Sequence, residues 1–163
     1  MHIGIAMLSI FATWLWGDWR NWQKYQTTML FIIMGNLLYN FLYADQLLWQ
    51  MKPDLFMSYK SVELMYTFIT LPLTTLVFLS NFPKEFNKQF LRILMFIAIY
   101  GCVELVMLRL DSIQYNRGWS YWSSIAWDSM MFPILALHFK KALISYLAAL
   151  VVIVTMATLF PAF

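Results

Sequence analysis

Apolar residues in this 163-residue chain gather into six long runs, and nearly all charged residues lie between them. The runs are Ile3–Trp16, Thr28–Ala44, Leu64–Ser80, Ile93–Leu108, Trp119–Leu137 and Ala142–Phe163. Apolar residues cover all faces of each run instead of alternating, which is typical of membrane helices and not of membrane β-strands. The pattern predicts an all-α fold: a single domain, residues 1–163, forming a polytopic transmembrane bundle of six helices. At about 21 Å, Ile3–Trp16 is short for a span, and the bundle has five helices if it does not cross.

The composition agrees with this pattern and excludes other classes of protein. The chain is 62% apolar and 12% charged, against roughly 45–50% and about 25% in soluble domains. Its 19% of aromatic residues excludes a disordered chain. The net charge of +3 is small and scattered over the connections, so we expect no nucleic-acid partner.

The basic residues predict the orientation of the bundle. The second and fourth connections hold four Lys and Arg residues, whereas the first, third and fifth hold seven, namely Arg20, Lys24, Lys84, Lys88, Arg92, Lys140 and Lys141. Because Lys and Arg are enriched in cytoplasmic loops, the odd connections are expected in the cytoplasm. In this multi-pass protein both termini are then expected to be extracytoplasmic if all six runs span, whereas the N-terminus is expected inside if the first run does not cross.

Two acidic residues, Glu104 and Asp128, lie well inside apolar runs. A charge there costs about 2.5–3.5 kcal/mol on insertion scales. Both are expected at similar depths, roughly 9 and 13 Å from the outer ends of adjacent helices, so that they face each other. Two such carboxyl groups in low dielectric cannot both ionise easily and can share a proton.

Other polar residues are expected to join these acids. Asn36 and Asn40 are one turn apart and offer donors, while Tyr100 and Ser124 each lie one turn before an acid. The expected polar cluster is Asn36, Asn40, Tyr100, Glu104, Ser124 and Asp128. It has two interpretations: a solute or proton site, or hydrogen-bonded glue between helices.

Two segments have the chemistry of a membrane surface. Trp16, Trp19, Trp22 and Tyr25 are three residues apart with charged residues between them, which predicts a short helix at the cytoplasmic surface. It is either a simple anchor or a lipid-specific one. The end of the fifth run is either a snorkelling helix end or a phosphate site. The candidate headgroup residues are Trp19, Arg20, Trp22, His138, Lys140 and Lys141.

The motifs of common enzymes do not occur in the sequence. It lacks the G-x-S-x-G, H-E-x-x-H, Walker and dinucleotide-binding patterns. Its two histidines, His2 and His138, are expected on opposite membrane faces, which argues against a His-based metal site. We therefore expect no catalytic residue, metal or cofactor, and favour a non-enzymatic protein over an enzyme acting on lipid.

Four segments carry a resemblance to a known family: Trp16–Tyr25 (WGDWRNWQKY), Met34–Tyr43 (MGNLLYNFLY), Asn116–Trp119 (NRGW) and Asp128–His138 (DSMMFPILALH). Over nearly its whole length the chain resembles an uncharacterised family of small polytopic membrane proteins from spore-forming Bacillus- and Clostridium-type bacteria. The resemblance implies a bacterial plasma-membrane protein. Asp18, Asn36, Asn40, Asp128 and His138 fall within the shared motifs.

Two functions remain open at this point. The first is an integral membrane protein that contacts membrane lipids and either binds a small solute or relays protons through the polar cluster. The alternative is a structural or accessory subunit whose Met and aromatic residues face a membrane-protein partner or a second copy. A water-filled cavity that reaches the two acids favours the first function, and a dry, fully packed bundle favours the second.

The predicted orientation has a direct test. Cysteine introduced by Ser58→Cys or Ser112→Cys is expected to react with an impermeant thiol reagent added outside intact cells, because both positions lie in connections that are poor in Lys and Arg. Cysteine introduced by Asn87→Cys is expected to stay unlabelled. Labelling at position 87 alone would invert the predicted orientation.

Overall fold

The computed structural model describes residues 1–53 and 57–161. In this part of the chain the elements are α1 (His2–Trp16), the 3-10 segment η1 (Trp19–Lys24), α2 (Gln26–Leu42), β1 (Trp49–Met51), α3 (Tyr59–Met65), the π-helical segment η2 (Tyr66–Thr70), α4 (Leu71–Leu79), α5 (Phe86–Arg109), β2 (Ile113–Tyr115), α6 (Tyr121–Lys140) and α7 (Ala142–Leu159). The fold is all-α, as the apolar runs predict.

Across residues 1–53 and 57–161 these helices make six rods, because α3, η2 and α4 follow one another without a break. Each rod overlaps one predicted apolar run. Three are long and apolar enough to cross a membrane: Tyr59–Leu79, Phe86–Arg109 and Ala142–Leu159. This number is compatible with a membrane protein but is smaller than the six expected. The helices α1 and α2, with 15 and 17 residues, fall short of the roughly 20 residues of a full span.

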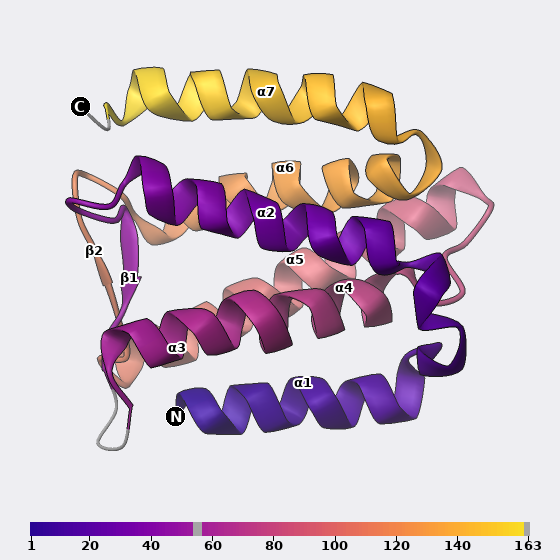
Figure 1. The fold of residues 1–163 in the computed structure, drawn as a ribbon, viewed down its shortest axis with the longest axis horizontal. Coiled ribbons are helices and arrows are strands. Elements are labelled where there is room, and N and C mark those ends of the chain that lie inside the picture. The colour runs from indigo at the N-terminus through magenta and orange to yellow at the C-terminus, as the bar shows by residue number, and fades with distance from the viewer. Residues whose placement is uncertain (54–56, 162–163) are drawn as a thin grey trace.

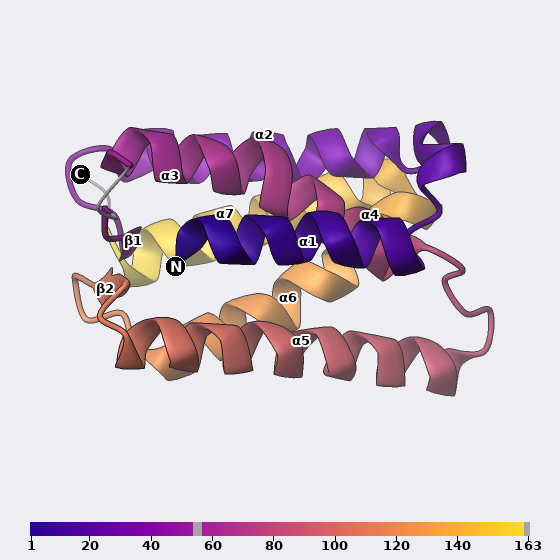
Figure 2. The same cartoon turned by 90° about the horizontal axis from the view of Figure 1, so that it is seen from below.

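The rods lie side by side along one axis, with successive connections at alternate ends (Figure 1; Figure 2). Within this bundle α6 packs against α5 on one side and α7 on the other, and α2 packs against α4 and α6. The helix α1 packs against α4 and η2. The helix α5 packs mainly against α6 and β2, so one of its sides is left without a helical neighbour.

A short antiparallel sheet joins two connections that are distant in sequence. Strand β1 pairs with β2 in the register Trp49 to Tyr115, Gln50 to Gln114 and Met51 to Ile113. An ion pair of 2.6 Å between Lys52 and Asp111 extends the contact. The sheet lies at the end of the bundle toward which both termini point (Figure 1). Strands of three residues are too short for an alternating pattern to reveal them, so the sequence did not predict this pair.

An aromatic cluster packs the helices together. Phe78 on α4 is fully buried, and its ring centroid lies 5.1 Å from those of both Phe96 on α5 and Phe132 on α6. Edge-to-face rings at this spacing gain more than their burial alone provides. The cluster joins α4, α5 and α6 but does not fill all of the space between the helices.

Candidate functional site

A cavity of about 1020 Å³ runs through the interior of the bundle. One end reaches Ser80 and Arg92, and the other reaches Trp49 and Ile113 beneath the β1–β2 pair. Most of its wall is apolar, with a small number of polar side chains. Cavities of this kind, apolar with a few placed polar groups, are typical of sites for small molecules.

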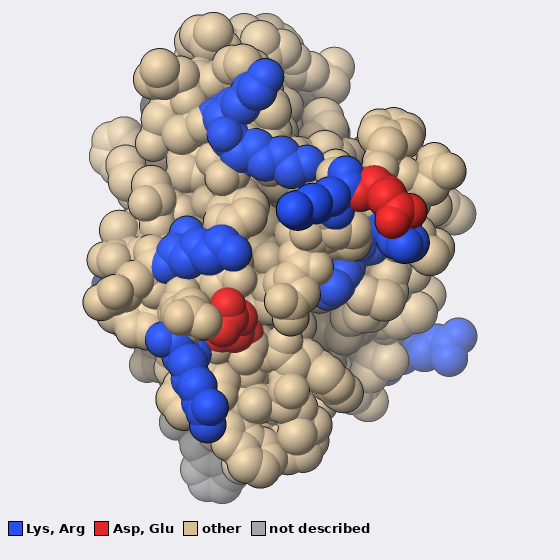
Figure 3. Space-filling view, turned by 90° about the vertical axis from the view of Figure 1, so that its right-hand side faces the viewer, with Lys and Arg blue, Asp and Glu red and all other residues tan. Residues whose placement is uncertain are grey.

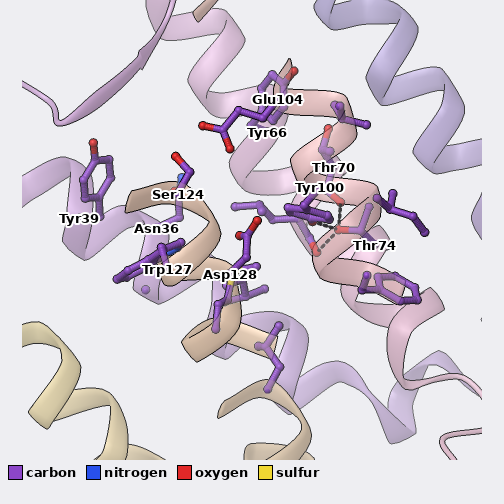
Figure 4. Close-up of a pocket in the computed structure, with 18 of the residues that line it drawn as sticks. Asn36, Tyr39, Tyr66, Thr70, Thr74, Tyr100, Glu104, Ser124, Trp127 and Asp128 are labelled. Atoms are coloured by element: carbon purple, nitrogen blue, oxygen red, sulfur yellow. Dashed lines mark hydrogen bonds between the residues drawn. The ribbon is translucent and has the colours of Figure 1, made fainter. Parts of the chain in front are cut away.

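Two carboxyl groups project into this cavity from adjacent helices (Figure 4). Glu104 comes from α5 and Asp128 from α6, and they lie close enough to interact electrostatically. No hydrogen bond between them occurs in the described structure. The helices approach closely at Gly101, where an added Cβ would lie 2.7 Å from Ile125 Cδ1. A glycine at this point therefore allows both acids to reach one space.

Glu104 is held by a hydrogen bond from its surroundings. The Tyr115 hydroxyl donates to Glu104 Oε1 at 2.5 Å, and the Ser124 side chain lies close to this carboxyl group. The Trp119 indole N–H donates to Ser124 Oγ at 2.9 Å. Burial and the neighbouring Glu104 carboxyl raise the pKa of the Tyr115 hydroxyl above its ordinary value, so Tyr115 remains a neutral donor at physiological pH.

Asp128 has a different environment. Its exposed fraction is 5%, and its carboxyl group points into the cavity (Figure 4). Glu104 is its electrostatic neighbour, and no residue in the described part of the chain hydrogen-bonds to it. Burying such a group without a partner is costly. Asp128 therefore has unused capacity to accept hydrogen bonds or to pair with a positive charge.

A second polar group lies on α2 and α3. The Asn36 side-chain amide donates to Thr67 Oγ1 at 2.8 Å, and the Asn40 amide donates to the Asn36 carbonyl at 2.9 Å. Asn40 and the backbone of Met51 also lie close to the carboxyl group of Glu63. Glu63 lines the same cavity as Glu104 and Asp128.

Five of the six residues of the expected polar cluster line the cavity: Asn36, Tyr100, Glu104, Ser124 and Asp128. Asn40 is set back from the wall and contacts Asn36 and Glu63. The expected bonds from the asparagines to Glu104 and Asp128 do not form among the described residues. The Tyr100 hydroxyl contacts Thr74 Oγ1 at 2.7 Å instead. Glu63 was missed because its helix begins five residues before the apolar run, at the cap Ser58.

The cavity wall also has an irregular helical segment. The π-helical turn Tyr66–Thr70 ends two residues before Pro72, whose missing N–H removes one helical hydrogen bond. Thr74 Oγ1 donates to the Thr70 carbonyl at 2.8 Å. Thr70 Oγ1 is itself buried with no hydrogen-bond partner among the described residues, and Thr70 lines the cavity. Single π-helical turns are frequent at functional sites.

The candidate headgroup residues lie at the end of the bundle where Lys and Arg gather (Figure 3). The predicted short helix is the segment η1, which contains no buried residue, and Trp19 and Trp22 are about half exposed. The Arg20 guanidinium lies 5.4 Å from the Trp19 ring. Lys140 donates to Gln89 at 2.8 Å, and Lys141 is exposed.

His138 is a correction to this set. Its exposed fraction is 3%, and its ring is stacked on Phe31 with 4.2 Å between the centroids. Its Nδ1 atom lies 2.9 Å from Thr28 Oγ1. These contacts come from α2, which is distant from His138 in sequence. The sequence of α6 alone therefore could not predict that His138 is buried. His138 packs helices together and is not placed to contact a lipid headgroup.

Comparison with protein-family models, curated proteins and solved structures gives no match for this chain. The chemistry of the site must be inferred from its own residues. Within residues 1–53 and 57–161, no three His, Cys, Asp or Glu side chains lie close enough together to hold a metal ion. The arrangement can accept hydrogen bonds, attract positive charge and surround an apolar molecule.

The role of His138 can be tested by stability. His138→Ala is expected to lower the free energy of unfolding in detergent by about 2 kcal/mol or more, because it removes a buried ring and leaves Thr28 unsatisfied. Lys141→Ala, at an exposed position in the next connection, is the control and is expected to change it little. Equal, small effects of both variants would contradict the packing role.

The contrast between the two acids gives a second prediction. Glu104→Leu is expected to lower the free energy of unfolding by about 1–3 kcal/mol, because it leaves the buried Tyr115 hydroxyl without its acceptor. Asp128→Leu leaves no such group and is expected to maintain or raise stability. Thermal unfolding in detergent measures both. A larger loss for Asp128→Leu than for Glu104→Leu would mean that Asp128 has structural partners.

Proposed function

We propose that this chain is an integral membrane protein that binds a small solute in the cavity reached by Glu104 and Asp128. The single observation that carries this proposal is the cavity of about 1020 Å³ with a buried carboxyl group directed into it. Its volume lies near the upper end of the range of small-molecule pockets, roughly 300–1,000 Å³. Intramembrane acids are costly and commonly mark such sites.

All six rods are proposed to cross the plasma membrane. The connections alternate between the two ends of the bundle (Figure 1), which is the arrangement that successive spans require. The seven basic residues of the odd connections belong to one end, and part of this charge is visible in Figure 3. By the preference of Lys and Arg for the cytoplasmic side, that end faces the cytoplasm and both termini face outward.

A polytopic bundle also explains which surfaces are apolar. The helix α7 exposes Leu143, Leu147 and Val151 by 65% or more of their area. In water such a surface is unfavourable, whereas in a bilayer it contacts lipid chains. The short rod α1 gains length from an exposed aromatic residue at its end, Trp16.

The other functions receive less support from the cavity. A proton relay between the two acids needs a hydrogen-bonded path, and none joins Glu104 to Asp128 in the described residues. An accessory subunit without a ligand is expected to be a packed bundle, because an empty interior forfeits contacts between side chains. The apolar face of α7 is available to lipid, to a partner or to a second copy.

The cavity's accessibility to small molecules can be tested by thiol labelling. In a Cys102→Ser background, Ser124→Cys is expected to react with neutral methyl methanethiosulfonate, because residue 124 lines the cavity. Ser145→Cys is the matched control, since Ser145 is fully buried outside the cavity wall, and is expected to stay unmodified. Mass spectrometry of the purified protein measures both. An unreactive cysteine at position 124 in folded protein would overturn the solute-binding proposal.

A further inference from the structure

The charges around the cavity are unequal and point to one class of solute. Glu63, Glu104 and Asp128 line it, and among its described lining residues Arg92 is the basic one. Arg92 precedes Glu104 by 12 residues on α5, about 18 Å along the helix. At such a distance it does not form an ion pair with Glu104, so the acidic half of the cavity lacks a balancing cation.

We propose that the solute is a lipophilic organic cation, which places its positive charge beside Asp128 and Glu104 and its apolar body against the cavity wall. This inference rests on the proposed function and names the class of ligand for the same site.

The environment of Asp128 supports a positively charged partner. Asp128 as a residue is 95% buried, and its carboxyl group points into the cavity (Figure 4) and accepts no hydrogen bond from the described residues. A buried carboxylate is stabilised when a cation pairs with it, whereas a neutral or anionic solute leaves its charge uncompensated. Thr70 Oγ1, a second unpartnered polar atom, belongs to the same wall.

The aromatic side chains of the cavity are also suited to a cation. Four of them, Tyr39, Trp49, Trp119 and Trp127, line the half that contains the acids. Trp49 lies at their centre: it is stacked on Tyr39, with 4.0 Å between the ring centroids, and lies 4.9 Å from Trp119 and 5.6 Å from Trp127. The ring faces that these contacts leave open to the cavity attract organic cations, and the attraction is stronger where water is excluded.

The donor set favours an organic cation over a metal ion. No three carboxylate, imidazole or thiol groups converge in the described chain, whereas Mg²⁺ and Ca²⁺ require several oxygen ligands around one point. Spread carboxyl groups and aromatic rings instead suit an extended molecule with delocalised or shielded charge. Such a molecule loses little hydration on entering an apolar space.

The route to the cavity explains why the cation must be lipophilic. The cavity wall includes Ile5, Leu8 and Ala12 of α1 and Met95, Ile99 and Val103 of α5. These two helices do not pack closely against each other, and a smaller hollow lies between them at Gly4 and Cys102. In the proposed orientation this side faces the hydrocarbon of the bilayer. A solute that partitions into lipid reaches the acids through it.

Tetraphenylphosphonium is a direct probe, because tetraphenylborate has the same shape and the opposite charge. With protein purified in a neutral detergent, isothermal titration calorimetry is expected to detect binding of tetraphenylphosphonium and little specific binding of tetraphenylborate. Asp128→Asn keeps the shape of the side chain and is expected to weaken tetraphenylphosphonium binding by about tenfold or more. The control Glu85→Gln removes an exposed carboxylate paired with Lys88 at 2.8 Å and is expected to bind like the unmodified protein.

The outcomes separate this inference from the proposed function. Equal affinity for the two probes, or tetraphenylphosphonium binding unaffected by Asp128→Asn, overturns the cation proposal. Absence of tetraphenylphosphonium binding overturns it too, but leaves solute binding standing if Ser124→Cys still reacts with methyl methanethiosulfonate. Failure of that labelling in folded protein overturns both. Circular dichroism of Asp128→Asn, expected to match the unmodified protein, shows that weaker binding is not a loss of fold.

Discussion

The position of α5 is the constraint on which the site depends. This helix is joined to the bundle through α6, where Gly101 allows close approach to Ile125, and through the β2 strand that follows it. The register of β1 with β2 then fixes the connection between α5 and α6 to the connection between α2 and α3. The contacts with α6 and β2 fix the position of α5, and no helix packs on its other side, so α5 remains separated from α1. The cavity lies in the space between these two helices.

The same arrangement gives the two acids opposite roles in stability. Glu104 accepts a hydrogen bond from the Tyr115 hydroxyl of β2, so its burial is compensated within the protein. Asp128 faces inward from α6 and has no such partner among the described residues. Under the proposed function, such a side chain is buried at a cost to folding and contributes to ligand binding. Stability and ligand affinity are therefore expected to change in opposite directions at position 128.

Apolar runs predicted the helices well because a membrane-like helix is determined locally, by its own hydrophobicity and hydrogen bonds. They also placed Glu104 and Asp128 on successive helices, α5 and α6. The partners of the polar groups could not be predicted in this way, because they depend on rotation and register between helices. Asn36 pairs with Thr67 and not with an acid, and His138 is covered by Phe31 of α2. The start of α3 was predictable from Ser58, a favoured N-cap residue, and would have brought Glu63 into the helix.

The distribution of charge along the bundle limits what a bound cation can do. In the proposed orientation, Glu63, Glu104 and Asp128 lie toward the outer side, and Arg92 and the other six basic residues of the odd connections lie toward the cytoplasm. A cation that leaves the acids in the cytoplasmic direction moves away from attractive charges and toward repulsive ones, in an apolar space where such interactions are weakly screened. This polarity favours holding the cation in the outer half of the membrane over conducting it inward. Exchange through the side between α1 and α5 avoids the basic end, which makes the bilayer both the source of the solute and the place to which it returns.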